Sequence, residues 1–151
     1  MSRDFRAGLL VGVVISILVI CAIGRFASVF ADDWVVVSGV SYHFARNGQN
    51  ERNTGLGREY RLTENNRLGF GAYNNSSNRF AAYLANGYTP YDCLGARCGV
   101  IGGLVTGYEQ GQKPAILGGF VATLERGSVG GNLIFIPAAG GVLFLQGKFR
   151  W

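Results

Sequence analysis

The chain has 151 residues, a formal net charge of +5, 48% hydrophobic residues and only 15% charged residues. This length suits one domain and leaves no room for a second sizeable core. The low charged fraction favours a membrane setting, and the scattered arginines exclude a basic stripe of the kind that binds nucleic acid. The 24 glycines and 13% aromatic residues, with no collagen-like period, predict many short strands joined by tight turns.

The first 31 residues have the pattern of an export segment. Arg3 and Arg6 precede an apolar run over residues 7–23, and small residues stand at −1 and −3 of a possible cleavage site after Ala31. The run is long for a signal peptide and just short of the ~20 residues of a transmembrane helix. We therefore expect residues 1–31 to be a cleaved signal peptide or a retained membrane anchor helix. Residues 32–151 would then form the exported domain.

From Trp34 onward, short β-type segments alternate with turn residues. The Asn, Gly and Pro between the segments are the residues that turns need. The segments predict strands over residues 34–43, 56–62, 68–73, 80–88, 99–108, 115–124, 130–136 and 142–151. Eight strands with short connections favour a closed barrel, which has no edge strand. The predicted fold is all-β, an eight-stranded antiparallel up-and-down β-barrel preceded by an N-terminal hydrophobic signal or anchor helix.

The last predicted strand indicates which face of the barrel is polar. Leu143, Leu145 and Phe149 fall on one face, and Gln146 and Lys148 fall on the other. In a membrane barrel the apolar face meets lipid and the polar face lines the interior. The alternative is a soluble lipocalin-like barrel with its charges outside and an apolar pocket inside.

Aromatic and glycine residues offer further clues to the barrel wall. We expect the aromatic residues near the strand ends to form interfacial girdles: Trp34, Tyr42, Tyr73, Tyr83, Tyr88, Tyr91, Tyr108 and Trp151. Three glycine pairs either leave space for a ligand inside the wall or mark tight curvature: Gly102–Gly103, Gly118–Gly119 and Gly130–Gly131.

Cys93 and Cys98 flank residues 94–97, which we expect to form a four-residue hairpin loop. In an exported protein, two cysteines placed in this way predict a disulfide. Two thiols and one distant histidine do not complete a tetrahedral set of ligands, so no metal site is expected. No glycine-rich phosphate loop opens a helix, so no nucleotide cofactor is expected either.

Several motifs, in order, resemble the lipid A palmitoyltransferases (PagP). His43 stands just upstream of Asn50-Glu51-Arg52, which is followed by Gly55-Leu56-Gly57. Residues 75–79 (Asn-Ser-Ser-Asn-Arg) and 85–88 (Ala-Asn-Gly-Tyr) are similar to the family's Asp-Ser loop and the strand after it. The Gly-rich residues 103–107, the Ile136-Pro137 turn and the terminal residues 148–151 extend the resemblance over nearly all of residues 37–151.

The resemblance implies an eight-stranded outer-membrane barrel that moves a palmitoyl chain from a phospholipid to lipid A, with the chain held in an apolar interior pocket. It would make His43 the base and Ser76 its hydroxyl partner, a pairing suited to acyl transfer. Asn75 stands at the family's Asp position and cannot supply a negative charge to an imidazolium. Glu51 and Arg52 would form a salt bridge in the interior or near the rim of the barrel.

Three functions remain open at this point. The first is acyl transfer or acyl hydrolysis on a membrane lipid (lipopolysaccharide or phospholipid), carried by His43 and Ser76. The second is a non-enzymatic envelope barrel that binds lipid or another partner. The third is a soluble periplasmic lipocalin-like carrier. The expected location is the bacterial cell envelope, foremost the outer membrane, and the sequence does not indicate an oligomeric state.

Overall fold

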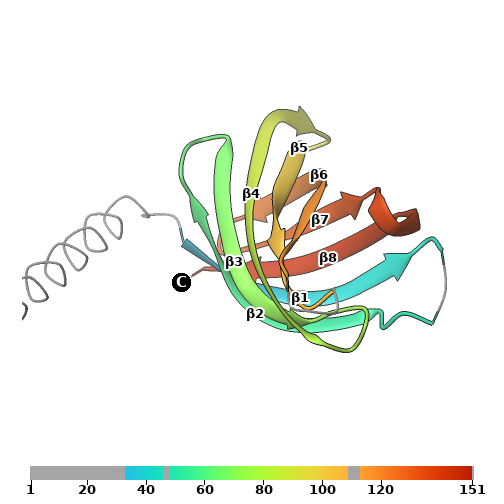
Figure 1. Cartoon of the computed structure of the whole chain (residues 1–151). Helices are drawn as coiled ribbons and strands as arrows, with labels where there is room; N and C mark the ends of the chain where they lie inside the picture. The colour runs from blue at the N-terminus through green and yellow to red at the C-terminus, as the bar shows by residue number, and fades with distance from the viewer. Residues whose placement is uncertain (1–32, 46–47, 109–112, 151) are drawn as a thin grey trace, which may run out of the picture. The chain divides into compact units, whose positions relative to one another are not determined.

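The computed structural model describes residues 33–45, 48–108 and 113–150, and it shows a closed antiparallel barrel of eight strands in sequence order (Figure 1). The barrel is built from β1 (Asp33–His43), β2 (Arg52–Arg61), β3 (Asn66–Asn74), β4 (Phe80–Cys93), β5 (Ala96–Val105), β6 (Ala115–Arg126), β7 (Val129–Ile136) and β8 (Val142–Phe149). A 3-10 turn, η1 (Ala138–Gly140), precedes β8. The all-β, eight-stranded, up-and-down prediction is confirmed.

The predicted signal or anchor helix lies outside the described residues. Within the described ranges, no helix has the length and apolar character needed to span a membrane.

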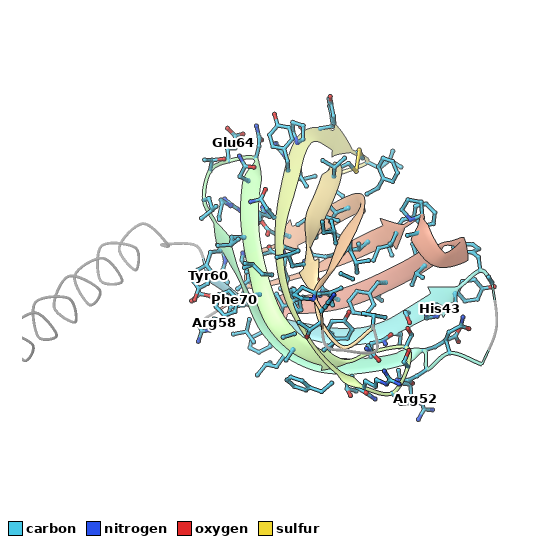
Figure 2. All side chains as sticks on the ribbon, viewed as in Figure 1. His43, Arg52, Arg58, Tyr60, Glu64 and Phe70 are labelled. Atoms are coloured by element: carbon cyan, nitrogen blue, oxygen red, sulfur yellow. A yellow bond between two sulfur atoms is a disulfide. The ribbon has the colours of Figure 1, made fainter. Side chains whose placement is uncertain are left out.

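The two ends of the barrel are chemically different, and we name them the rim and the base. At the rim, β1 ends and β2 begins, and the other rim loops join β3 to β4, β5 to β6 and β7 to β8. The base holds the start of β1 and the loop that joins β2 to β3. Figure 2 shows His43 and Arg52 at the rim, with Arg58, Tyr60 and Glu64 toward the base.

The polarity of the barrel is inverted relative to that of a soluble protein. Glu59, Arg67 and Lys148 lie inside and are 7%, 5% and 3% exposed. Large apolar side chains cover the outside on all eight strands and are between 41% and 84% exposed. We call these outward residues the apolar belt: Val37, Val40, Leu56, Phe70, Phe80, Leu84, Val100, Leu104, Ile116, Phe120, Leu124, Val129, Leu133, Leu145 and Phe149. The predicted polar and apolar faces of the last strand are confirmed.

Strand β2 begins at Arg52, earlier than the predicted residue 56. Asn50 causes the early start, because its Oδ1 accepts the N–H of Arg52 at 3.0 Å and forms a local turn. Arg52 then pairs with Val40 of β1. The first residues of β2 are polar, so apolar periodicity does not mark them as part of a strand.

The hairpin between β4 and β5 is tighter than predicted. Its turn is Leu94–Gly95, and the four-residue loop expected from the sequence is wrong. Leu94 and Gly95 have φ values of 54° and 85°, which match the two-residue turn that suits the twist of a hairpin.

The predicted disulfide is confirmed, because the sulfurs of Cys93 and Cys98 are bonded and their Cα atoms lie 5.9 Å apart. It joins β4 to β5 next to the turn. Strand β4 continues through Pro90, and the register with β5 shifts between Tyr88 and Tyr91. This irregularity accommodates a residue that has no N–H to donate to the sheet.

Two glycines make room for an aromatic ring on the inner wall. A Cβ added to Gly57 would lie 2.5 Å from the Tyr83 hydroxyl, and one added to Gly71 would lie 2.9 Å from the Tyr83 ring. Gly57 and Gly71 are register partners on β2 and β3, so their bare backbones form one shallow platform. Tyr83 reaches across this platform from β4 and fills part of the interior.

The expected aromatic girdle is wrong for Trp34, Tyr73 and Tyr83, which face the interior, and it stays a prediction for the exposed tyrosines. Tyr42, Tyr88 and Tyr91 are exposed, whereas Trp34 is fully buried and Tyr83 lines an interior cavity. Side chains alternate along a strand, so Trp34 shares the inward face with Val36 and cannot point outward. Closeness to a strand end did not decide which way a ring points.

Candidate functional site

A cavity of about 120 Å³ lies inside the barrel. Its walls are mostly apolar, and their main aliphatic and aromatic residues are Val36, Tyr83, Ile101, Val105, Val121, Ile134 and Phe144. Glu59, Arg67 and Gln146 supply a polar part of the lining. An apolar cavity of roughly 150 Å³ in another protein admits a benzene-sized group, so this space suits a segment of an alkyl chain.

Two inward glycines give the cavity part of its width. A Cβ added to Gly87 would meet no atom within 4 Å, and the nearest atoms to one added to Gly69 would be at 3.8 Å. Both residues line the cavity. They differ from Gly103 and Gly119, where a Cβ would lie 2.3 Å and 2.2 Å from a carbonyl oxygen of the adjacent strand. The glycine pairs named from the sequence therefore include close-approach positions as well as Gly102 and Gly118, which line the cavity and have no atom closer than 3.9 Å to an added Cβ.

A buried charge cluster lies on the base side of the barrel. Lys148 Nζ lies 2.6 Å from Glu59 Oε1 and 2.7 Å from Glu125 Oε1. Arg67 donates to both Glu125 oxygens at 2.6 Å and 3.1 Å, and Arg61 donates to Glu125 at 2.8 Å. We call these five residues the base network. Each buried charge has an opposite charge in contact, which buried ions require.

Neutral side chains extend the base network across the barrel. Asn132 Nδ2 donates to Glu59 Oε2 at 2.8 Å, and Asn132 Oδ1 accepts the Thr123 hydroxyl at 2.9 Å. Gln146 connects this group to Ser38 of β1 through a 3.4 Å contact. The network therefore ties β1, β2, β6, β7 and β8 together through the interior.

Trp34 lies on the base side of this network and is fully buried. The Lys148 ammonium lies 5.0 Å and the Arg150 guanidinium 4.8 Å from its ring centroid, within cation–π distance. The ring and the ion cluster together fill the base side of the barrel.

His43 lies at the rim end of β1 and faces inward, with 6% of its surface exposed. Its backbone N–H contacts Glu51 Oε1 at 3.5 Å. The ring Nδ1 is buried and has no hydrogen-bond partner. Glu51 therefore contacts the backbone of His43, and the predicted Glu51–Arg52 salt bridge is not found among the described residues.

Asn75, at the family's Asp position, supports the β3–β4 loop. Its side chain is fully buried, and Oδ1 accepts the N–H groups of Ser77 at 2.9 Å and Arg79 at 3.0 Å. Its Nδ2 donates to the carbonyl of Gly107 at 2.9 Å. An ionised aspartate has no proton to donate to that carbonyl, so the amide suits this position better than the carboxylate. In this structure Asn75 holds two rim loops together.

Ser76 is half-buried in the same loop. Its carbonyl oxygen accepts the N–H of Asn50 at 2.8 Å, so the β1–β2 and β3–β4 loops touch at this point. The structure thus brings together the two loops that carry the predicted acyl-transfer residues. It does not join the His43 Nδ1 to the Ser76 hydroxyl, because that nitrogen has no partner.

Sequence reasoning named three residues that line the cavity, Gly102, Gly103 and Gly118, and missed most of the others. The alternation of side chains along β3 and β4 offered a signal for these residues. It places the small residues Gly69 and Gly71 on the inner face of β3, and Ala85 and Gly87 on the inner face of β4. In the described part of the chain, no group of three or more His, Cys, Asp or Glu side chains could hold a metal ion.

No protein-family model and no curated protein matches the chain. The resemblance to the lipid A palmitoyltransferases therefore rests on the motifs quoted above, and its implications remain expectations.

Proposed function

We propose that this protein is a small barrel of the bacterial outer membrane whose interior binds an alkyl chain of a membrane lipid. The observation that carries the proposal is the inverted polarity, with an apolar belt around all eight strands and buried charges inside. Lipid solvates such an outer face, and barrel closure pairs most of the backbone within the wall, without water.

The soluble-carrier alternative fits this polarity poorly. A lipocalin-like barrel needs polar residues on its outer face to stay in water. Monomeric soluble proteins rarely expose contiguous apolar patches larger than a few hundred Å². Here exposed Leu, Val, Ile and Phe side chains follow the outer face of every strand.

The wall offers a route for a chain to enter from the side. Strand β6 pairs with β7 only from Phe120 to Arg126, so among the described strands its first residues have β5 as their only ladder partner. Pro114 precedes β6 and Pro137 follows β7, and neither can donate a backbone hydrogen bond. Ile136 and Leu117, beside this unpaired edge, both line the cavity. A lipid tail could pass from the bilayer to the cavity at this point.

Acyl transfer is the second candidate. It is favoured by the free Nδ1 of His43 at the rim and by the contact between the loops that carry Asn50 and Ser76. Small movements of these loops could place the Ser76 hydroxyl or a lipid hydroxyl against the imidazole, which would then act as a general base. Chain binding requires no such movement and is therefore the primary proposal.

The membrane setting is tested with a charge placed on the apolar belt. Leu84 lies at the middle of β4, faces outward and is 50% exposed. In a bilayer Leu84→Arg should cost about 2–4 kcal/mol of unfolding free energy. In a soluble protein an exposed substitution of this kind changes stability by less than about 0.5 kcal/mol. Urea unfolding in lipid vesicles measures the difference.

Thr54→Arg is the matched control, because Thr54 is exposed on β2 near the rim, where an arginine reaches water. Equal unfolding free energies for the two variants, or a native protein that stays in the aqueous phase without detergent, would reject the membrane proposal.

Chain binding is tested by filling the cavity. Gly87→Met places a side chain into the open space, and Gly147→Met adds the same side chain outside, where a Cβ also meets no atom within 4 Å. Native mass spectrometry with phospholipids and lysophospholipids should show weaker lipid binding for Gly87→Met alone. If both variants bind lipid like the native protein, the cavity is not the binding site.

The acyl-transfer candidate has its own readout. Purified protein in vesicles of phospholipid and lipid A is analysed by lipid mass spectrometry. Transfer or loss of an acyl chain that disappears in His43→Ala supports the enzyme. An unchanged lipid profile leaves chain binding as the function.

A further inference from the structure

Three buried polar side chains near the rim carry atoms without partners. Ser41, His43 and Asn53 are 7%, 6% and 2% exposed. Within the part of the chain that the structure describes, the Ser41 hydroxyl, the His43 Nδ1 and the Asn53 Oδ1 are buried and have no hydrogen bond. We call these three residues the rim polar cluster. A buried polar atom left unpaired costs about 1–3 kcal/mol, so three on one hairpin point to a ligand.

The three residues share the inner face of the β1–β2 hairpin. Ser41 and His43 are two apart on β1, and the outward Tyr42 lies between them. Arg52 pairs with Val40, and both face outward, so the next residue, Asn53, faces inward, diagonally across the strand pair from Ser41, which bonds to Glu51. One short segment of wall therefore presents all three unpaired atoms to the interior.

The residues of the rim polar cluster do not line the cavity themselves, but two residues that do line it, Phe144 and Tyr73, are their neighbours on the adjacent strands. Phe144 is the register partner of Ser41 on β8, and Tyr73 pairs with Gly55, two residues from Asn53. The rings of Phe144 and Tyr73 contact each other with centroids 5.8 Å apart, and both line the cavity. Phe144 lies on β8 and Tyr73 on β3, the strands on either side of the β1–β2 pair. The contact between the two rings therefore passes over the inner face of that pair. A chain in the cavity would thus end beside the rim polar cluster.

The unpaired atoms define the chemistry of the group they would bind. Asn53 Nδ2 already donates to the carbonyl of Asn74 at 3.1 Å, which fixes Oδ1 as a free acceptor. The Ser41 hydroxyl can donate and accept, and a neutral imidazole Nδ1 can do either according to its tautomer. A phosphate or an ester offers acceptors only and would leave Asn53 Oδ1 unpaired. A hydroxyl or an amide both donates and accepts.

We propose that Ser41, His43 and Asn53 form a subsite for a neutral hydroxyl or amide group of the bound lipid, adjacent to its alkyl chain. This inference rests on the proposed binding of an alkyl chain in the cavity. In this proposal the rim polar cluster selects among lipids, and the apolar walls of the cavity bind the alkyl chain.

The test compares two probes with the same chain, dodecanamide and methyl dodecanoate. The first carries N–H donors, and the second carries acceptors only. The native protein is held in dodecyldimethylamine oxide micelles, whose headgroup offers no strong N–H or O–H donor, and binding is titrated by native mass spectrometry. Dodecanamide should bind about tenfold more tightly, the effect of restoring one missing buried hydrogen bond.

Two variants locate the preference. Ser41→Ala removes only the unpaired hydroxyl, because the backbone N–H of Ser41 keeps its 2.9 Å bond to the Glu51 carbonyl. Asn53→Leu removes the free acceptor at similar size, together with the hydrogen bond from Nδ2 to the Asn74 carbonyl. Each should reduce the preference for dodecanamide to about twofold or less while the affinity for methyl dodecanoate is unchanged. A heat-dependent gel shift verifies that each variant is folded.

The outcomes separate this inference from the proposed function. Equal binding of the two probes to the native protein, or an unchanged preference in both variants, overturns the subsite while chain binding stands. Failure of both probes to bind overturns chain binding and the subsite together. Gly87→Met should weaken both probes by the same factor, because it acts on the chain and not on the polar group.

Discussion

The ammonium of Lys148 lies 2.6 Å from the carboxylate of Glu59 inside the barrel, where the Lys148 side chain is fully buried. The same ammonium contacts Glu125 at 2.7 Å, and Arg67 reaches Glu59 at 3.4 Å. A barrel surrounded by lipid has no aqueous surface at its mid-height, so its charges gather in the interior and must be paired there. The ion pair is the structural counterpart of the apolar belt.

Removing the cation of this pair should be severe. Lys148→Met keeps most of the volume, but among the described residues it leaves Glu59 with one contacting cation, Arg67 at 3.4 Å, beside its hydrogen bond from Asn132. Glu125 loses one of its three cations. The expected loss is about 3–5 kcal/mol of unfolding free energy. The measurement is urea unfolding in vesicles, with Glu59→Gln added to the same chain as the control. Partial recovery of stability in the double variant is expected, and no loss in Lys148→Met would contradict the pairing.

Asn75→Asp introduces the carboxylate that the lipid A palmitoyltransferases have at the corresponding position. We expect that this substitution does not create an enzyme. The aspartate can still accept the N–H groups of Ser77 and Arg79, but it cannot donate to the Gly107 carbonyl. We expect a loss of about 1–3 kcal/mol and no new acyl transfer. Ser77→Ala, at an exposed position of the same loop, is the control. Appearance of acyl transfer in Asn75→Asp would show that the loop is catalytic.

Gly57→Ala should destabilise the wall, because the added methyl group would meet the Phe70 carbonyl oxygen and the Tyr83 hydroxyl, each at 2.5 Å. Overpacking of this kind costs about 1–3 kcal/mol. Gly147→Ala makes the same chemical change at an open outward position and should be close to neutral. Thermal and urea unfolding of the two variants measures the difference. Equal stabilities would mean that Tyr83 does not rest on the Gly57–Gly71 platform.

The disulfide can be verified by a non-reducing digest. Trypsin cleaves after Arg97, between the two cysteines, so residues 80–97 and 98–126 should be recovered as one linked species that separates on reduction. Replacing Cys93 and Cys98 with serine should cost about 2 kcal/mol at most, since the bond closes a very short loop. Separate peptides without reductant would contradict the bond.

Much of the fold could be predicted from the sequence because period-2 alternation is a local property. Strand β1 was predicted to within one residue at its start, and the inward position of Lys148 followed from the polarity of its neighbours. The errors in the predicted strand limits also have local causes. The polar start of β2 hid that strand's first residues, and Pro90 hid the continuation of β4 to Cys93.

The candidate site was harder to predict because its residues meet across the barrel. His43 could be singled out as the only histidine, and Asn75 and Ser76 were found through the resemblance. The three hydrogen bonds that assign Asn75 to loop support come from partners in two different loops. Ser41 and Asn53 carried no signal in the sequence, since an unpaired polar atom is a property of its surroundings.

By itself the sequence determined that this chain forms eight strands with one polar and one apolar face, because the alternation of polar and apolar residues is a local property of each segment. Only the tertiary structure decided which residues close the interior. The register of eight strands places Glu59, Glu125 and Lys148 in contact although they lie far apart along the chain. The same closure buries Trp34, leaves space beside Gly87, and leaves one side-chain atom of each residue in the rim polar cluster without a partner among the described residues. Contacts across a closed barrel depend on the register of every strand pair, and no single segment encodes that register.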